Sequence, residues 1–399
     1  MSNNMHKMSF LMFCMGMTAT ISASAENNVD TGNMDTHKIG VVVYNIADEQ
    51  VISFRDYLEN YIEECFQDVQ FIYSSSITTP EMEMQFIQDV CDAGAEGILS
   101  FNSYDLKAEV ELCEANQVYY MRAASSISDE DYEEVKDNPY FIGAVGPGEE
   151  MEYEAGYNMA KYFAENYEGD EYFILSGGAG YGVGMHQERT KGILDGLQDA
   201  YSVKFDTDME ELVKTPAEIT AEAGELKVCV ASGFLDSNDF LPQIQEFYQS
   251  HPYGIVLSVY PVCDMVKVLK DAKLGVIDCY DERNMQLFVE DKLHYVTGKF
   301  SSAIGPSFAA MYNAVTGYAE KFRENGQAFR LTQGFWTSDN LDDYLEKYTY
   351  SSSIVLNAYN YEDLDDVCKV YNPNAALEDL KELVSAYTFE DVVARRSGK

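Results

Sequence analysis

The stretch K-I-G-V-V-V-Y-N, residues Lys38–Asn45, is an apolar run that ends in polar side chains. Two later runs have the same form: G-I-L-S-F-N at Gly97–Asn102 and Y-F-I-L-S-G at Tyr172–Gly177. Segments of helical length with one apolar face lie between such runs. This alternation predicts an α/β protein with doubly wound parallel sheets. Ligands bind outside the carboxyl ends of the strands in such sheets, so the polar residues that end each run are candidate site residues.

The strand-helix unit occurs in two series, which predicts two lobes. The length of 399 residues suits two domains of ordinary size. The other predicted strands are Val69–Tyr73, Val118–Met121, Asn138–Ala144, Val203–Phe205, Lys227–Ala231, Gly254–Val259, Leu274–Asp278 and Tyr295–Gly298. We expect a continuous helix over Ala303–Asn325 to return the chain to the first lobe.

The predicted boundaries divide the chain into five parts. Residues 1–25 are a signal peptide and residues 26–37 a linker. The first lobe takes residues 38–147 and 300–328, and the second takes residues 148–299 and 329–349. Residues 350–399 form a C-terminal extension with a helical pattern, which we expect to pack on the lobes.

The amino terminus has the form of an export signal. Lys7 precedes an apolar stretch, Met8–Ile21, that is too short for a membrane span, and Ala23–Ala25 provides the small residues of a cleavage site. We expect cleavage before Glu26 and an exported chain in the periplasm or at the extracellular face. A bulky phenylalanine precedes Cys14, which argues against a lipid anchor there.

The charge of the chain limits its partners. With 68 acidic and 27 basic residues, the formal net charge is −41. A surface this negative repels phosphate polyanions, so neither nucleic acid nor an anionic membrane surface is an expected partner.

Seven cysteines remain after cleavage, an odd number, and none forms a C-x-x-C pair. They are Cys65, Cys91, Cys113, Cys229, Cys263, Cys279 and Cys368. This pattern suggests neither a disulfide framework nor a zinc site, and buried thiols that pack as small apolar groups fit it best.

Several segments resemble a known family, in order and in spacing. They are A-G-A-E-G-I-L-S-F-N (Ala93–Asn102), N-P-Y-F-I-G-A-V with E-A-G-Y-N-M-A (Asn138–Ala160), L-S-G-G-A-G with Q-E-R-T-K-G-I (Leu175–Ile193), E-D-K-L-H-Y-V-T (Glu290–Thr297) and F-W-T-S-D-N-L-D-D-Y-L (Phe335–Leu345). Together they look like the type I periplasmic binding proteins of simple-sugar ABC uptake systems, such as the ribose- and galactose-binding proteins. The resemblance implies two α/β lobes that are joined by a hinge of three crossovers and close over a ligand.

The resemblance also implies which residues contact the ligand, because in that family the contacts come from strand ends and the loops that follow them. Carried over position by position, the ligand-binding residues are Asn45, Asp48, Asn102, Tyr104, Arg122, Arg189, Tyr260, Asp278 and Lys299. Amide, carboxylate and guanidinium groups in fixed positions suit the hydroxyls of a sugar or sugar derivative.

Three positions depart from the family pattern. Gln50 and Val51 stand where sugar binders carry aromatic residues, Arg122 lacks its usual aspartate partner, and Tyr260 stands where an asparagine is usual. Arg122, Arg189 and Lys299 together also suit an anionic ligand, such as a sugar acid or a phosphate. The ligand therefore stays open at this point.

Structural roles compete with ligand binding at several of these residues. Asp278 and Asn102 could cap the helices that follow them, and Arg189 could pair with a neighbouring acid. If Arg189 contacts the ligand, its replacement should abolish binding and leave the stability of the unliganded protein nearly unchanged.

No cofactor, metal or catalytic residue is expected. The loop Gly177–Gly182 lacks the lysine and hydroxyl of a P-loop and misses the dinucleotide spacing, so a loop that shapes the site is the better interpretation. The histidines show no metal-ligand spacing, and a nucleophile elbow is lacking.

The sequence thus favours an exported substrate-binding protein that delivers its ligand to the membrane permease of an ABC transporter. Two alternatives remain at this stage: a sensory receptor that reports a sugar or signal molecule to a membrane kinase, and an enzyme on the same scaffold.

Overall fold

The computed structural model describes residues 36–125, 127–237, 239–262, 265–269, 271–352 and 356–397. The predicted signal peptide and the linker up to residue 35 lie outside this part of the chain, and so do Cys14 and Cys263. Residues from Thr36 onward form one unit. Every described helix falls short of the length and apolar character that a membrane span requires.

The first sheet has six strands in the order β12-β5-β4-β3-β1-β2, and all of its pairs are parallel. Its strands are β1 (His37–Val42), β2 (Val69–Tyr73), β3 (Gly97–Ser100), β4 (Tyr119–Ala123), β5 (Phe141–Gly146) and β12 (Phe329–Thr332). β3 and β5 are buried throughout, as expected of strands that are covered on both faces.

The second sheet has seven strands in the order β13-β11-β10-β9-β6-β8-β7. They are β6 (Glu171–Gly177), β7 (Glu218–Ala223), β8 (Leu226–Ser232), β9 (Ile255–Ser258), β10 (Lys273–Cys279), β11 (Leu293–Lys299) and β13 (Trp336–Ser338). The five inner strands are parallel, and the two edge strands β7 and β13 run antiparallel to their neighbours. The predicted α/β class with two parallel-dominated sheets is confirmed.

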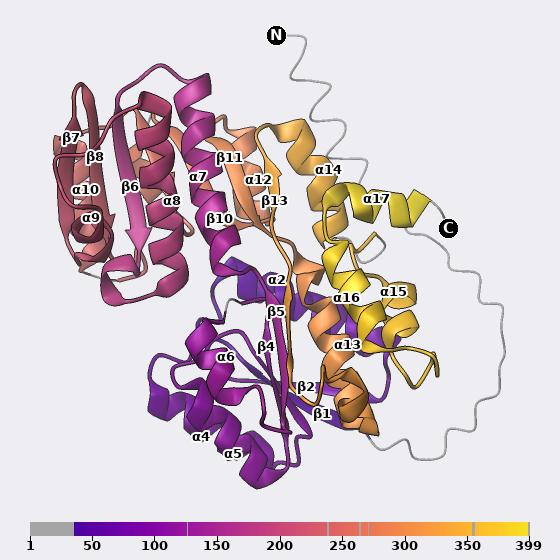
Figure 1. Cartoon of the computed structure of the whole chain (residues 1–399). Helices are drawn as coiled ribbons and strands as arrows, with labels where there is room; N and C mark the ends of the chain where they lie inside the picture. The colour runs from indigo at the N-terminus through magenta and orange to yellow at the C-terminus, as the bar shows by residue number, and fades with distance from the viewer. Residues whose placement is uncertain are drawn as a thin grey trace. The chain divides into compact units, whose positions relative to one another are not determined.

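The helices connect the strands and cover the sheets (Figure 1). In the first lobe they are α2 (Glu49–Tyr57, continued by a π turn at Leu58–Ile62 and by α3 at Glu63–Cys65), α4 (Pro80–Asp92), α5 (Leu106–Asn116), α6 (Asp129–Val135) and α13 (Gly305–Asn313). In the second lobe they are α7 (Glu149–Asn166), α8 (Gly184–Tyr201), α9 (Met209–Lys214), α10 (Phe240–Ser250), α11 (Val266–Leu269), α12 (Glu282–Val289) and α14 (Leu341–Ser352).

Side-chain caps fix where several of these helices begin. Asp48 accepts from backbone N–H groups of the first turn of α2, and Asp105 and Asp281 do the same for α5 and α12. Each cap lies just beyond the carboxyl end of a strand. Because an N-cap satisfies otherwise unpaired N–H groups, these three aspartates hold the loops of one edge of each sheet in place.

Three segments differ from the sequence-based expectation. No strand forms at Val203–Phe205; the loop there bonds to β7 instead, through Asp206 and Glu222. The expected helix Ala303–Asn325 stops at Asn313, and Gly317, with a φ of +90°, lies in the irregular turns that follow.

The third difference moves a predicted boundary. Residues 329–332 were expected in the second lobe, but β12 pairs with β5 in the first sheet. The chain crosses to the second sheet only between Thr332 and Trp336. A short parallel edge strand of four residues carries too weak a pattern in the sequence to place it.

The C-terminal extension contributes helices α15 (Tyr361–Val367), α16 (Leu377–Ser385) and α17 (Phe389–Ser397). In Figure 1, α15 and α16 lie beside α13 and pack on it, and α17 lies beside α14. The Tyr57 hydroxyl of α2 donates to the Tyr359 carbonyl at 2.8 Å, and the Trp336 indole donates to the Tyr387 carbonyl at 2.8 Å. The extension therefore contacts both the first lobe and β13 of the second sheet.

Helices α7 and α8 approach each other at glycines. A Cβ on Gly156 would lie 2.0 Å from the Arg189 carbonyl oxygen, and a Cβ on Gly192 would lie 2.0 Å from the Tyr153 carbonyl oxygen. The two backbones touch directly at these points. The contact holds Arg189 of α8 against α7, where Glu152 lies.

Candidate functional site

The sequence-predicted site residues lie at or just beyond the carboxyl ends of strands in both sheets, apart from Arg189 on α8. The first lobe contributes Asn45, Asp48, Asn102, Tyr104 and Arg122, and the second contributes Arg189, Tyr260, Asp278 and Lys299. Electrostatic interactions connect the two sets. Lys299 of β11 interacts with Asp48 beyond β1 and with Arg122 of β4, and Asp278 of β10 interacts with Asp48.

Asp48 is tied into the first lobe. Its Oδ1 accepts from the N–H groups of Gln50 and Val51, at 3.0 and 3.2 Å, and from the Tyr44 hydroxyl at 2.8 Å. Burial raises the pKa of the Asp48 carboxyl above its usual value, although these bonds and the charge of Lys299 act in the opposite direction. Asp48 is therefore both a helix cap and the first-lobe carboxylate that interacts with the second lobe.

Asp278 is the corresponding carboxyl group of the second lobe. The Asn284 side-chain amide donates to its Oδ2 at 2.7 Å. Burial, and then the neighbouring Asp281, raise the pKa of Asp278 well above its usual value.

One group of described residues has a geometry that could hold a metal ion. Ligand atoms of Asp278, Cys279 and Asp281 all lie within 4.8 Å of one another. The Cys279 thiol donates to Asp281 at 3.5 Å, and Asp281 also caps α12. Burial raises the pKa of the Cys279 thiol well above its usual value, so the neutral thiol, a poor metal ligand, is favoured.

Arg189 forms its hydrogen bonds to residues of the second lobe. Its Nε donates to Glu152 Oε2 at 2.5 Å, and its Nη1 donates to the Val259 carbonyl oxygen at 2.7 Å. Both side chains of the ion pair are buried. The guanidinium group also lies 5.6 Å from the ring centroid of Phe335, in the last crossover.

Tyr260 and His186 form an aromatic pair beside Arg189. Their ring centroids are 5.8 Å apart, and the Tyr260 hydroxyl donates to the Gly233 carbonyl at 2.9 Å. His186 Nδ1 accepts from the Gly178 N–H at 2.9 Å. Burial, with the nearby charges of Arg189 and Lys299, lowers the pKa of His186 to about 3, so the ring stays neutral at physiological pH.

Two predicted residues have peripheral positions. The Asn45 side chain accepts from the Ala47 N–H at 3.0 Å and so closes a local turn. The Tyr104 side chain is 47% exposed. One ion pair joins the two lobes nearby: Arg283 of α12 lies 3.4 Å from Glu49 of α2.

Three comparisons place this architecture among known proteins. No protein-family model matches the chain, and no curated protein sequence matches it. Among solved structures, a galactofuranose-binding protein has a TM-score of 0.58 at 12% identity over 79% of this chain and 98% of its own. A solute-binding protein of Actinobacillus succinogenes with bound D-allose has a TM-score of 0.58 at 12% identity, over 78% of this chain and 100% of its own.

A third solved structure, a solute-binding protein of Bacillus halodurans with bound myo-inositol, has a TM-score of 0.56 at 14% identity, over 80% of this chain and 99% of its own. The chain has the fold of the type I periplasmic binding proteins. The resemblance noted in the sequence is thereby confirmed for the fold.

A buried carboxyl pair that the sequence did not indicate supports the loop after β3 of this binding-protein fold. Glu83 of α4 and Glu109 of α5 both accept from the Tyr104 N–H, at 2.9 and 3.0 Å, and Tyr120 donates to Glu109 at 2.5 Å. Glu83 is 1% exposed. Its burial, and then the charge of Glu109, raise the pKa of Glu83 to about 8.

This pair predicts a pH dependence of stability. The folded state keeps a proton on Glu83 that the unfolded chain releases above its usual pKa of 4.5, so stability should fall as pH rises toward 8. The slope contributed by one proton is at most about 1.4 kcal/mol per pH unit. Glu83→Gln should remove this contribution, as measured by urea unfolding at pH 5, 6, 7 and 8.

The exposed Glu111 of α5 provides the matched control. Glu111→Gln should keep the pH dependence of the parent protein. If Glu83→Gln and Glu111→Gln give the same pH profile, Glu83 does not keep its proton in the folded state.

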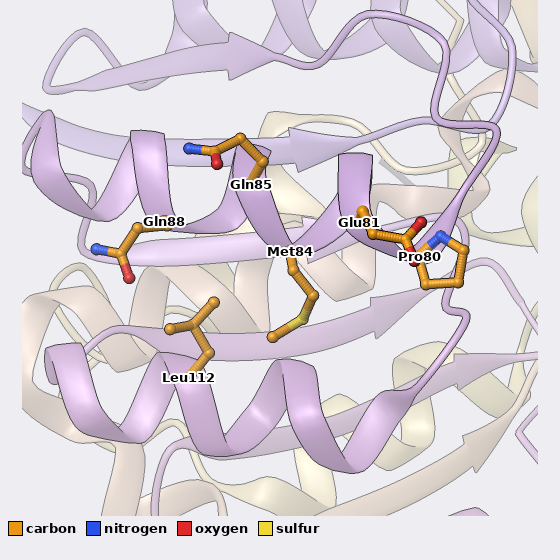
Figure 2. A pocket seen from close by; sticks show the side chains of 6 residues that line it. All are labelled: Pro80, Glu81, Met84, Gln85, Gln88 and Leu112. Carbon is orange, nitrogen blue, oxygen red and sulfur yellow. The ribbon is translucent and has the colours of Figure 1, made fainter.

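A surface hollow lies apart from the strand-end residues. It is lined by Pro80, Glu81, Met84, Gln85 and Gln88 of α4 and by Leu112 of α5 (Figure 2). None of the nine sequence-predicted site residues lines it. Residues that line it can therefore serve as control positions in binding experiments.

Proposed function

We propose that this protein is an exported substrate-binding protein of an ABC uptake system, which captures a small polar ligand between two lobes by hinge closure. The observation that carries the proposal is that charged residues beyond the strand ends of the two sheets meet: Arg283 of α12 lies 3.4 Å from Glu49 of α2, and Lys299 interacts electrostatically with Asp48 and Arg122. The neighbours in the structure comparison are named as binding proteins for sugars or inositol, which supports a sugar or sugar derivative as the ligand.

The proposed lobes follow the sheets. The first lobe comprises residues 38–147 and 300–332, with β12 added to it, and the second comprises residues 148–299 and 335–349; residues 350–399 are the extension. Three crossovers join the lobes, after β5, after β11 and after β12. A ligand that touches both lobes stabilises only the closed state, so binding energy drives closure.

The rest of the proposal concerns location and partners. The signal peptide at residues 1–25 directs export, and a membrane permease receives the ligand from the closed form. The site residues are proposed to bind and not to transform the ligand, since all of the neighbours described above are named as binding proteins.

A binding screen tests this function. The mature chain from residue 26 should gain stability with at least one monosaccharide, sugar acid, sugar phosphate or inositol in a thermal-shift screen, followed by calorimetric titration. A ligand at a hundred times its Kd adds about 2.7 kcal/mol to the free energy of unfolding. No shift with any of these solutes, nor with nucleosides or amino acids, would contradict the proposal.

Asp48→Asn is the site variant for this screen. Asparagine keeps an oxygen that can cap α2, so the fold should be retained. Loss of a charged acceptor should weaken binding on the order of 10- to 100-fold. Gln85→Ala, in the hollow of Figure 2, is the control and should bind as the parent does.

A further inference from the structure

Among the described lysines and arginines, only three are buried, and all three belong to the candidate site. They are Arg122, Arg189 and Lys299. Burying a cation is costly unless an anion or several acceptors compensate it. Glu152 compensates Arg189 through the ion pair described above. The other two cations lack such a partner.

Arg122 is held by neutral oxygens. Its Nη1 donates to the Ser100 carbonyl and hydroxyl oxygens, at 3.3 and 3.2 Å, and its Nη2 donates to the Ser125 hydroxyl at 2.8 Å. Within the described part of the chain, no carboxylate forms an ion pair with it. These bonds orient the guanidinium group, and its charge interacts electrostatically with the buried Glu83 without an ion pair.

Lys299 has even fewer partners. It is 7% exposed, and its ammonium group makes no hydrogen bond and no ion pair with any described residue. Asp48 and Glu152 interact with its charge electrostatically. Burial lowers the pKa of Lys299 to about 8; the charge of Glu152 acts in the opposite direction, and the charges of Arg189 and Arg122 act in the same direction as burial.

An unsatisfied donor lies on the loop that Arg122 contacts. The Asn102 side-chain nitrogen is buried without a hydrogen-bond partner. Ser100 links the two residues, because its hydroxyl accepts from Arg122 and donates to the Asn102 carbonyl oxygen. Arg122 and Asn102 thus share Ser100 at the end of β3, and Arg122 interacts electrostatically with Lys299 of the second sheet.

The carboxyl groups lie in a different chemical setting. Asp48 and Asp278 each accept hydrogen bonds from the protein, and burial raises the pKa of both. Such groups suit hydroxyls, which donate and accept. The donors around Lys299 instead require a group that only accepts, and an anionic one compensates the buried charges.

We propose that Arg122, Lys299 and Asn102 form a subsite for an anionic oxygen group, so that the ligand is a sugar acid or a sugar phosphate and not a neutral sugar. This inference rests on the proposed function, and it assigns the chemical class of the ligand. The overall charge of −41 makes such a subsite more necessary, because an anionic ligand is repelled by the rest of the protein.

Matched ligand sets test the inference. Calorimetric titration at pH 7 compares galactose with galacturonate and galactose 6-phosphate, and glucose with glucuronate and glucose 6-phosphate. In at least one set an anionic member should bind 100-fold or more tightly than the neutral sugar. A preference for the carboxylate or for the phosphate identifies which group the subsite accepts.

Lys299→Met removes the charge with little change in side-chain length. The variant should be at least as stable as the parent protein, because a buried cation is lost, and should lose the preference for the anionic member. Lys292→Met is the control. Lys292 directly precedes β11, and its replacement should leave the preference for the anionic member unchanged. If Lys299→Met does not fold, Arg122→Gln serves the same comparison.

The pH provides a second readout. As pH rises from 7 to 9.5 the Lys299 ammonium loses its proton, so the affinity for the anionic ligand should fall while that for a neutral sugar stays constant. The bound anion raises the pKa of the ammonium, which places the loss above pH 8. The Lys299→Met variant should show no such dependence.

Two results would overturn the inference. Equal or tighter binding of the neutral member in every set overturns the inference alone and leaves the proposed function intact. Absence of binding by any polar solute in the wider screen overturns both.

Discussion

Replacing Arg189 with alanine is expected to lower the free energy of unfolding by about 3–5 kcal/mol, in the absence of any ligand. The substitution leaves Glu152 buried without its cation, and it removes the donor of the Val259 carbonyl. An uncompensated buried carboxylate is among the most destabilising single changes in a protein core. Urea unfolding of the mature chain at pH 7 measures the loss.

Two further variants show whether the ion pair is the cause. Lys191→Ala, on the exposed face of the same helix, should stay within about 0.5 kcal/mol of the parent protein. The double variant Glu152→Gln with Arg189→Met should recover part of the loss, because it removes both charges. Equal stability of Arg189→Ala and Lys191→Ala would contradict a structural role for Arg189.

Replacing Gly192 with alanine is expected to lower the free energy of unfolding by about 3 kcal/mol, at the upper end of the range for overpacked sites. The added methyl group would lie 2.0 Å from the Tyr153 carbonyl oxygen, and backbone cannot move aside as a flexible side chain can. Helices α7 and α8 would have to separate, which would also loosen the contact between Arg189 and Glu152. The measurement is the midpoint and slope of urea unfolding.

Gly184, at the start of the same helix, provides the control. A Cβ there meets nothing within 4 Å. Gly184→Ala should leave stability unchanged or raise it by up to about 1 kcal/mol, because alanine restricts the unfolded chain. If both substitutions have the same effect, the close approach of the two helices is not a determinant of stability.

The fold could largely be predicted from the sequence because its buried parallel strands are nearly continuous apolar runs. β3, β6, β9 and β10 all lie within or close to the predicted ranges. The segments that were missed carry weak patterns: β7 alternates polar and apolar residues at an exposed edge, and β12 has four residues. Their positions depend on tertiary pairing, which a local pattern does not encode.

The candidate site could be predicted in outline only. Strand ends and the family resemblance indicate which residues would lie near a ligand, and together they predicted Asp48, Arg122, Asp278 and Lys299. They do not indicate which charges are already compensated. Arg189 and Lys299 look alike in the sequence, yet Glu152 of another helix forms an ion pair with Arg189, whereas Lys299 forms no ion pair with a described residue. The sequence-based expectation was that Arg189 could be replaced without a loss of stability. The structure instead leads us to expect a large loss.

The bond between Tyr57 and Tyr359 joins residues 302 positions apart, and the Tyr361 N–H bonds to the Tyr61 hydroxyl over 300 positions. During synthesis, these partners of α2 emerge from the ribosome only after nearly the entire chain has been made. Contacts so distant in sequence form late, since the intervening chain must be ordered first. The first lobe therefore cannot be completed before the helices of the C-terminal extension have been made.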